Sequence, residues 1–370
     1  MKIRKLGYLL LIVPIMGLAT NSWDRVELEE RGFVITMAID AAQPDEDSPA
    51  DRIKLAMTLP GPRAVAEQED DGVAIYAEQG QTIAQVKENI CRKMSESLYF
   101  GHAKVLIFGE EILADGDLLA RVLEDIAANS EINSKCIVLA TGDPIEDILA
   151  AKPHGQNLVG LHISKYYEAI GGNGAGGVGK MDLEMLRDAL NRDNSAIIPK
   201  ISLCEDEEGL IFGGGAILAD FELVRFAEDE ELAGLLWFRR GGGEIRTICT
   251  NDEYISLKIV SHRGKFNFLE ENGKLICIAE VKISGSIENY LTMPIDGLDE
   301  AFADSISGEI LEIFGIMRDE GGIDGFALRE RLRKRHHGLY TRHNAACDND
   351  WADIYQNMEI RPVVNVKIVN

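Results

Sequence analysis

The sequence has few cysteines, and none of them lie close together. No Cys-x-x-Cys pair occurs, so a zinc ribbon and a thioredoxin-type motif are both unsupported. Half of the cysteines stand in apolar, strand-like runs, which predicts buried thiols. A disulfide between distant positions stays open. The cysteines are Cys91, Cys136, Cys204, Cys249, Cys277 and Cys347, and those in apolar runs are Cys136, Cys249 and Cys277.

Basic residues are outnumbered by acidic ones. The 370 residues include 38 lysines and arginines against 62 aspartates and glutamates, a net charge of −24. Phosphate groups would be repelled over most of such a surface, so no nucleic-acid partner is expected. The same repulsion argues against wide contact with an anionic bilayer.

Long apolar runs are almost absent. One occurs at Leu6–Ala19, after a basic start at Lys2, Arg4 and Lys5, and no other segment is apolar enough to span a bilayer. This pattern is typical of a secretory signal and is shorter than the roughly 20 residues of a spanning helix. Residues 1–22 are therefore predicted to be a signal peptide or an N-terminal anchor. The remainder is expected to be exported and close to the outer face of a membrane.

Catalytic motifs are missing as well. The sequence has no Gly-x-Ser-x-Gly, no His-Glu-x-x-His and no Cys–His arrangement. Glu27, Glu29 and Glu30 form an acidic lead-in without a paired base, so a solvated face accounts for them. His102 stands alone at the start of a strand, where a structural hydrogen bond is expected. The sequence predicts a protein that binds rather than catalyses, with no catalytic residue and no cofactor.

The C-terminal part holds residue types that bind zinc, but their spacing matches no closed site. His336 and His337 are adjacent and cannot face the same way on a helix. We expect a solvated polar segment and no metal. The residues weighed as ligands are His336, His337, His343, Cys347, Asp348 and Asp350.

What the sequence does contain is an alternation of helical and strand patterns, organised around Leu98–Glu110. Within that stretch, the apolar run Val105–Phe108 suits a strand covered on both faces. Helices are predicted on either side, at Thr82–Ser97 and Glu111–Asn129. An antiparallel hairpin followed by alternating helices and strands indicates an α+β fold. The other strands expected here are Phe33–Ala41, Arg52–Leu59, Val73–Tyr76 and Cys136–Ala140.

The pattern of predicted helices and strands changes twice along the sequence, which predicts three mixed α/β domains. Residues 23–200 would form an N-terminal α+β layer, 201–290 a middle, mainly antiparallel sheet, and 291–370 a C-terminal helix–helix–strand unit. In the middle part Ala233–Phe238 is one of the predicted strands, and Lys265–Gly273 predicts a hairpin. The C-terminal elements expected are helices at Leu298–Arg318 and Gly325–His336, a polar stretch to Asp350, a turn at Trp351–Tyr355 and a strand at Arg361–Val369.

A glycine-rich loop at 171–180 matches part of a nucleotide-binding motif. Gly174, Gly179 and Lys180 fit the first part of a P-loop, but that motif needs a strand before its glycines. Here the preceding residues predict a helix, and Met181 stands where a magnesium-binding Ser or Thr is required. We expect a flexible linker between helices.

The end of the second C-terminal helix is strongly basic in an otherwise acidic chain. Such a run could face lipid head groups or an acidic partner, or be a solvated helix face with neighbours one turn away. It is the candidate interaction surface of the sequence. Its members are Arg329, Arg331, Arg333, Lys334 and Arg335.

Several short motifs, in order and spacing, resemble the Ger(x)C family, the C subunits of nutrient germinant receptors in spore-forming bacteria. The resemblance covers almost the whole chain, although no single motif is diagnostic. The matching motifs are Trp23-Asp24-Arg25-x-Glu27-Leu28, Leu98-Tyr99-Phe100-Gly101-His102-x-Lys104-Val105-Leu106-Ile107, Gly214-Gly215-Ala216-x-Leu218 with Gly234-Leu235-Leu236-Trp237, and Asp324-Gly325-Phe326 with the later Trp351.

The resemblance implies a lipoprotein of three mixed domains, without enzymatic activity, that acts beside membrane-embedded A- and B-type subunits at the spore's inner membrane. One position departs from the family pattern: Ser22 stands where the lipidated cysteine is expected, so thioether lipidation there is excluded. Attachment would then come from an uncleaved signal or from the partner subunits, unless the chain is released.

Two other functions stay open at this point. A free exported solute-binding protein would need a pocket with convergent polar groups between domains. A nucleotide hydrolase would need binding that depends on Lys180.

Overall fold

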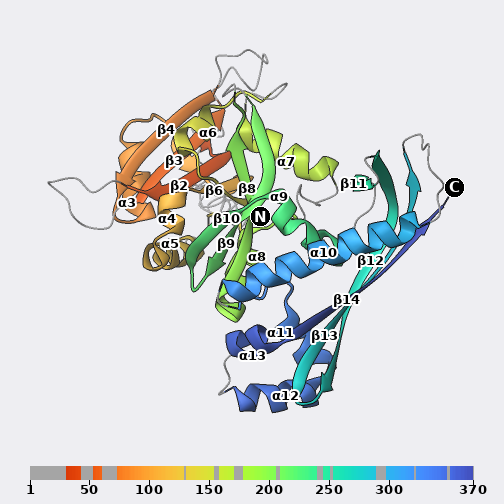
Figure 1. Ribbon diagram of the computed structural model, residues 1–370. Helices are drawn as coiled ribbons and strands as arrows, with labels where there is room; N and C mark the ends of the chain where they lie inside the picture. The colour runs from red at the N-terminus through yellow and green to blue at the C-terminus, as the bar shows by residue number, and fades with distance from the viewer. Residues whose placement is uncertain are drawn as a thin grey trace, which may run out of the picture.

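The structure is a computed structural model, and it describes residues 31–42, 53–60, 73–128, 131–153, 158–170, 178–205, 209–239, 245–250, 253–288, 297–320, 322–347 and 351–369. These residues form two main sheets with helices packed on them, which confirms the α+β class (Figure 1). Leu6–Ala19, Ser22 and the acidic lead-in lie outside the described residues, as does 171–177 of the glycine-rich loop.

The larger sheet has eight strands in the order β10-β9-β8-β7-β6-β2-β3-β4. Its middle strands run parallel, whereas both ends are antiparallel. Every residue of β6 and β7 is buried, as expected for apolar strands between two helical layers. The strands are β2 (Thr36–Ala41), β3 (Ile53–Pro60), β4 (Val73–Gly80), β6 (Val105–Phe108), β7 (Ile137–Ala140), β8 (Ser195–Leu203), β9 (Leu210–Ala219) and β10 (Glu222–Ala227).

Alternate residues of these strands enter two different cores, because side chains of a strand point to opposite faces in turn. Leu106 and Phe108 pack with α3, α4, α5 and α8, whereas Val105 and Ile107 pack with α6 and α7. The sheet is therefore covered by helices on both faces. The helices are α3 (Ile83–Cys91), α4 (Glu110–Leu113), α5 (Gly116–Ala128), α6 (Ile145–Ala150), α7 (Val159–Ala169) and α8 (Leu183–Asp193).

Two of the predicted helices are shorter than expected. The first ends at Cys91, and Ser97–Tyr99 forms β5, which pairs with β1 (Arg31–Phe33) in a small parallel sheet. The second is broken between α4 and α5, where the Asp115 carboxylate accepts a hydrogen bond from the Leu118 amide at 2.9 Å. A side chain that binds a nearby backbone amide favours a new helix start over continuation.

The second sheet has four strands in the order β11-β12-β13-β14. The predicted hairpin joins β12 to β13 through Asn272 and Gly273, both with positive φ, at 52° and 77°. Such a pair is favoured in two-residue hairpin turns. The closing strand β14 then pairs parallel with β13. The bounds are β11 (Ile245–Thr250), β12 (Glu253–Glu271), β13 (Lys274–Ile287) and β14 (Glu359–Ile368).

One face of this sheet is covered by helices from the C-terminal part. The long helix predicted at Leu298–Arg318 is α10, and its buried side chains, such as Phe302 and Ile310, enter the same core as Phe266 of β12. The polar stretch was predicted without a helix, and the turn after it as a turn only; both expectations are wrong, because α12 and α13 form there. The bounds are α10 (Leu298–Asp319), α11 (Leu328–Arg335), α12 (His337–Ala346) and α13 (Trp351–Asn357).

The predicted strand at Ala233–Phe238 is also wrong. These residues form the 3-10 helix η3 (Ala233–Phe238), directly after α9 (Asp229–Leu232). Gly234 packs against α10 so closely that a Cβ there would lie 2.5 Å from the Glu309 carbonyl oxygen. An apolar run without periodicity fits a buried helix as well as a strand, and here the contact with α10 decides.

The two sheets are not separated by a linker. The predicted boundary at residue 200 falls inside β8, and β9 and β10 extend the larger sheet beyond it. Ile197 of β8 and Ile217 of β9 belong to the same core as α10. Figure 1 shows α10 running from the larger sheet to the smaller one. Across the described ranges, no helix combines the length and apolar character that crossing a bilayer requires.

Candidate functional site

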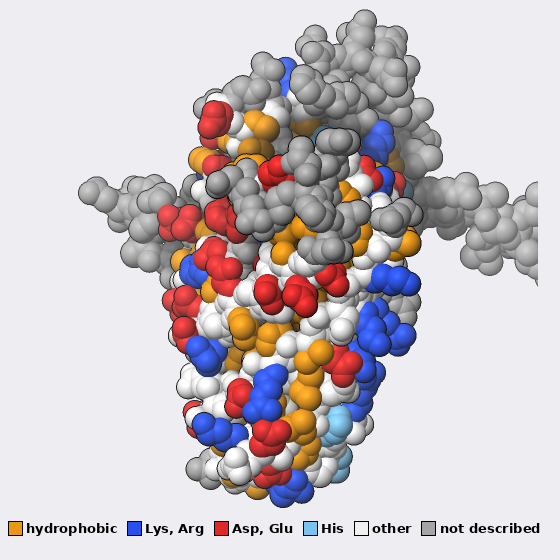
Figure 2. Space-filling model, turned by 45° about the vertical axis from the view of Figure 1, so that its right-hand side comes forward, with side chains coloured by type: hydrophobic (Ala, Val, Ile, Leu, Met, Phe, Trp, Pro, Cys, Tyr) orange, Lys and Arg blue, Asp and Glu red, His pale blue; other side chains and the backbone are white. Residues whose placement is uncertain are grey.

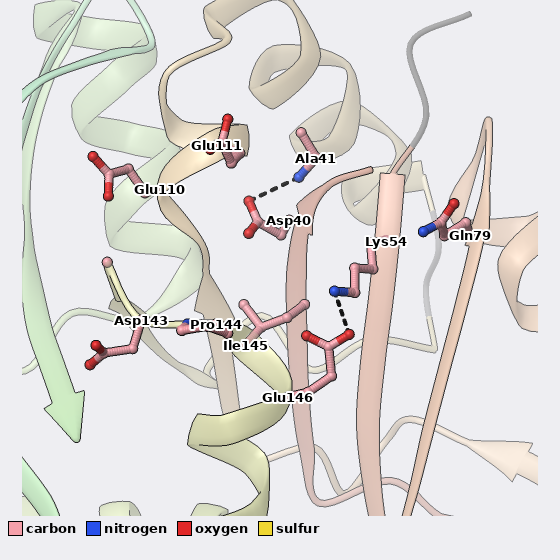
Figure 3. A pocket seen from close by; sticks show the side chains of 11 residues that line it. Asp40, Ala41, Lys54, Gln79, Glu110, Glu111, Asp143, Pro144, Ile145 and Glu146 are labelled. Carbon is pink, nitrogen blue, oxygen red and sulfur yellow. Dashed lines mark hydrogen bonds and ion pairs between the residues drawn. The ribbon is translucent and has the colours of Figure 1, made fainter. Parts of the chain in front are cut away.

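A pocket of about 250 Å³ lies at the carboxyl ends of the parallel strands (Figure 3). β2 leads on to strands at one side of the sheet and β6 to strands at the other, so the pocket sits where the strand order reverses. Ligands of open α/β sheets bind at this kind of position. The lining comprises Asp40, Ala41, Lys54, Gln79, Glu110, Glu111, Gly142, Asp143, Pro144, Ile145 and Glu146.

Asp40 is the most constrained acidic side chain of this pocket. Its carboxylate accepts hydrogen bonds from the amides of Ala41 at 2.9 Å and Ile112 at 3.0 Å. The second bond satisfies a backbone amide in the first turn of α4, which Gly109, at the N-cap, cannot satisfy because it has no side chain. A Cβ at Gly109 would overlap the Asp40 carboxyl group. Burial raises the pKa of Asp40, while the two amides oppose that shift.

The charges of the pocket are mostly negative. Lys54 is its one lysine and is paired with Glu146. The Asp143 carboxylate accepts a hydrogen bond from the Leu203 amide at 2.8 Å and so ties the start of α6 to β8. A phosphate would be repelled here. Within the described residues, no group of three or more His, Cys, Asp or Glu side chains is placed to hold a metal ion.

The histidines singled out in the sequence do not converge. His102 packs against the rings of Phe33 and Tyr99, with centroids 5.3 and 5.5 Å away. His336 contacts the ring of Phe268, and His343 lies 4.0 Å from a Glu270 oxygen. Asp348 and Asp350 lie outside the described residues.

The cysteines are free thiols in this structure. Cys136 and Cys277 are buried, as predicted, but Cys249 is exposed, which makes that prediction wrong. Cys249 pairs with Tyr254 on the outer side of β11, an edge strand, and no helix covers it there. Lys180 is exposed between the glycine-rich loop and α8, and the segment before that loop is the predicted helix α7.

The basic run on α11 does not form one surface. Arg331 is half-buried: it lies over the ring of Phe266 at 5.4 Å and donates a hydrogen bond to the Phe326 carbonyl at 3.1 Å. Arg335 is exposed, and Lys334 pairs with Glu330 at 2.6 Å.

Arg329 and Arg333 stand one turn apart on α11 and face α8. With Arg192, Asp193, Glu330 and Tyr340 they line a second pocket of about 170 Å³ between the two helices. Arg192 is bound there by the carboxylates of Asp193 at 2.8 Å and Glu330 at 3.6 Å. The Arg192–Glu330 pair joins the N-terminal and C-terminal parts of the chain, whereas Arg333 stays exposed at the rim of this pocket.

A buried polar centre forms another connection between elements. The Glu309 carboxylate on α10 accepts a hydrogen bond from Trp237 Nε1 at 2.9 Å and pairs with Arg246 of β11. Trp237 is the last residue of the Gly234–Trp237 motif, and Gly234 provides the close contact with α10. The motif thus holds η3, α10 and β11 together. In the sequence it was noted only because it resembles a motif of the Ger(x)C family, and this structural role was not predicted.

The fold and the contacts together define a class: an α+β protein of two joined modules with a buried polar centre between its elements. Two family models cover most of the chain. Residues 24–203 match the spore germination protein N-terminal domain, and residues 213–370 match the C-terminal domain described as spore germination B3/GerAC-like. The chain belongs to the Ger(x)C family of germinant receptor C subunits, which confirms the resemblance seen in its motifs.

Individual relatives agree with this assignment. The chain is 20% identical to the putative spore germination protein YfkR of Bacillus subtilis, with 95% of this chain and 93% of that protein covered. It is also 20% identical to the spore germination protein YndF of Bacillus subtilis, covering 99% and 97%. The crystal structure of the GerBC protein aligns with a TM-score of 0.55 at 16% identity, over 90% of this chain and 97% of that one. That likeness shows a shared fold.

Proposed function

We propose that this chain acts without catalysis, as a docking subunit of a nutrient germinant receptor beside A- and B-type membrane subunits. The observation that carries the proposal is the family match over both halves of the chain, which the structure joins through α10 and the Glu309 centre. The pockets of about 250 and 170 Å³ are smaller than the roughly 300 Å³ at which ligand pockets usually begin, whereas a third pocket, of about 560 Å³, is lined by α3 and the end of α5. Pocket size therefore does not decide against the alternative, a free exported solute-binding protein, and the family match is what favours docking.

The partner-facing surface proposed here is the exposed end of α11. Arg333, Lys334 and Arg335 project from the last turn of this helix, where cations are also favoured by the helix dipole. Arg331 is excluded from this surface because its packing on Phe266 is structural.

The first prediction concerns this surface. The triple variant R333Q/K334Q/R335Q is expected to recover at least about tenfold less of the A- and B-type subunits on affinity purification from spore membranes, since three rim charges are lost. R92Q/K93Q/R121Q makes the same charge change on the opposite module and is the matched control. Equal recovery from both variants would refute this surface.

Loss of the whole subunit tests the function itself. Deleting the gene, in a strain without a redundant receptor, is expected to abolish germination on nutrients, and the wild-type gene is expected to restore it. Normal nutrient germination after deletion would contradict the receptor role.

We further propose that the chain is exported and held at the outer face of the spore's inner membrane, without a lipid on Ser22. Fractionation of spores with and without the partner subunits separates the modes of attachment. Membrane recovery that depends on the partners indicates protein contacts. Recovery without them indicates Leu6–Ala19 as an anchor, and a soluble, trimmed chain would favour the solute-binding alternative.

A further inference from the structure

The outer face of the four-stranded sheet is not covered by any described helix. Val281 and Ile283 of β13 are buried in the core with α10, so Lys282 and Ser284 between them point to the other side. Lys282 is exposed, as is Lys367 of β14. This outer face is therefore open over the width of β12, β13 and β14.

Cations gather on the half of this face that lies away from the hairpin turn. The strand register places Arg263, Lys282 and Asn365 in one row, Ser261, Ser284 and Lys367 in the next, and Lys258 with Ser286 in a third. Rows two residues apart are about 7 Å apart, so the cations lie within about two Debye lengths of one another at physiological salt. We call this set, Lys258, Arg263, Lys282 and Lys367, the basic patch.

Acidic neighbours neutralise the basic patch only in part. Glu288, directly after β13, lies 3.5 Å from Lys258. Glu280, in the row next to Lys282, has its pKa lowered first by its hydrogen bond with Lys265 and also by the charge of Lys282. In the other half, by contrast, Lys265 pairs with Glu280, and Arg361 with Glu271 and Glu359. In the view of Figure 2, basic side chains gather along part of the right-hand margin of the molecule, whereas acidic side chains are more frequent to their left.

Two of the cations are placed at a cost to the fold. Arg263 and Lys282 are direct cross-strand partners, and like charges in that position are destabilising. Glu280 in the next row offsets part of this repulsion through its attraction to Lys282. An external anion held between Arg263 and Lys282 would remove the rest, so the register favours a negatively charged partner.

Exposed aliphatic side chains border the same cations. The bulge between Ile259 and Ser261 inserts Val260, and both Val260 and Ser261 then face outward, because Ile259 and His262 belong to the inner side. Val260 is 64% exposed and Ile245, across from Lys258, is 60% exposed. Cations mixed with exposed apolar side chains on a flat face suit a lipid head-group layer better than a water-filled anion pocket.

We propose that the basic patch is the surface by which this chain rests on an anionic bilayer. Each basic residue near such a surface strengthens partitioning by about fivefold. Four of them would orient the chain without anchoring it, and the net charge of −24 confines the contact to this patch. The inference deepens the proposed function, since a receptor subunit at a membrane needs a defined orientation.

Lysine footprinting on the full chain tests the patch residue by residue. The chain is mixed with vesicles of phosphatidylcholine alone or with 30% phosphatidylglycerol, and lysine acetylation is read by mass spectrometry. We expect labelling of Lys258, Lys282 and Lys367 to slow at least about fivefold with anionic vesicles and to recover in 0.5 M salt. Lys93 and Lys135, exposed on the other module, are internal controls and should not change.

A charge variant makes the test specific. R263Q/K282Q/K367Q should lose the protection of Lys258 and partition about a hundredfold more weakly, while R333Q/K334Q/R335Q, with the same net charge, should keep both. The first variant relieves the Arg263–Lys282 repulsion and should fold. Equal labelling in all vesicles, or protection that requires an added receptor subunit, would overturn the membrane assignment. Either result leaves the docking test on α11 unaffected.

Discussion

Glu309 shows what a single buried charge contributes here. Its carboxylate is 8% exposed and is bound by the indole of Trp237 and the guanidinium of Arg246. A buried carboxylate is tolerated only when such partners replace water. The centre therefore depends on all three side chains being present.

Glu309→Ala is expected to lower the free energy of unfolding by about 3–5 kcal/mol, because Arg246 and Trp237 would both lose their buried acceptor. Urea denaturation followed by tryptophan fluorescence measures this. Glu312→Ala, on the exposed side of the same helix, should change it by less than about 0.5 kcal/mol. Similar losses for both variants would mean that Glu309 has no special role.

Asp324 is fully buried, and its pKa is raised to about 6. Desolvation is the main cause, and it outweighs the hydrogen bonds that the carboxylate accepts from the amides of Leu328 at 2.7 Å and Arg329 at 2.8 Å. The folded chain thus binds a proton more tightly at Asp324 than the unfolded chain does. Stability contributed by this proton is present below about pH 4 and is lost as the pH rises toward about 6.

The corresponding prediction is a difference in pH dependence. Between pH 4 and 6 the wild type should lose about 2 kcal/mol of unfolding free energy relative to Asp324→Asn, out of a full effect of about 3 kcal/mol at about 1.4 kcal/mol per pKa unit. Urea titrations at several pH values measure it. Asp319→Asn, on an exposed side chain, should follow the wild type. Parallel profiles for wild type and Asp324→Asn would contradict the raised pKa.

Among the elements, α11 begins in an unusual way. Ala327, directly before it, has a positive φ of 51°, which glycine adopts more easily than alanine. The Asp324 carboxylate then binds the first amides of the helix. This geometry fixes where the basic side chains of α11 point.

Ala327→Gly is therefore expected to stabilise the chain by about 0.5–1 kcal/mol, because it relieves the left-handed strain. Ala303→Gly, inside α10, should instead destabilise it by about 1 kcal/mol. Thermal and urea unfolding of the two variants measure the effect of the same substitution, alanine to glycine, at a residue with positive φ and at a residue inside a helix. A loss of stability in both would show that Ala327 is not strained.

The elements that the sequence predicted well are those whose pattern is local. Val105–Phe108 is apolar throughout and forms β6, and α10 keeps its apolar spacing over its whole length. α12 was missed because none of its residues is buried, so it has no apolar periodicity to detect.

The pocket at the strand ends was also missed, for a different reason. Asp40 stands at the end of the apolar strand β2, and Glu110 and Asp143 follow β6 and β7 by a few residues; that repeated pattern was the available signal. What brings them together is the strand order β7-β6-β2, which no local pattern specifies. The basic run was found in the sequence. Which of its side chains pack, form ion pairs or face solvent depends on where α11 begins, because that position sets the direction in which each side chain points.

For the whole molecule, the position of β9 matters most. The first family model ends with β8 at residue 203 and the second begins inside β9 at residue 213, yet these strands are antiparallel neighbours in one sheet. A cut at that place exposes a sheet edge on one side and removes Ile197 from the α10 core on the other. We therefore expect that the modules of the family do not fold independently of each other in this chain.

A fragment of residues 24–203 is consequently expected to aggregate, whereas 24–228, which keeps β9 and β10, should stay more soluble and show a cooperative thermal transition. Circular dichroism and size-exclusion chromatography distinguish the two. Equal behaviour of both fragments would mean that β9 is dispensable for the larger sheet.

The parallel pairing of β14 with β13 also affects the order in which the chain folds. All of α10, α11, α12 and α13 lie between these strands in the chain, so the pair is a contact of long sequence separation and is slow to form. The edge of the smaller sheet is therefore completed only after the last residues have left the ribosome. Under the export proposed above, a chain that is incomplete during synthesis remains loose enough to pass an export channel and completes this sheet on the far side.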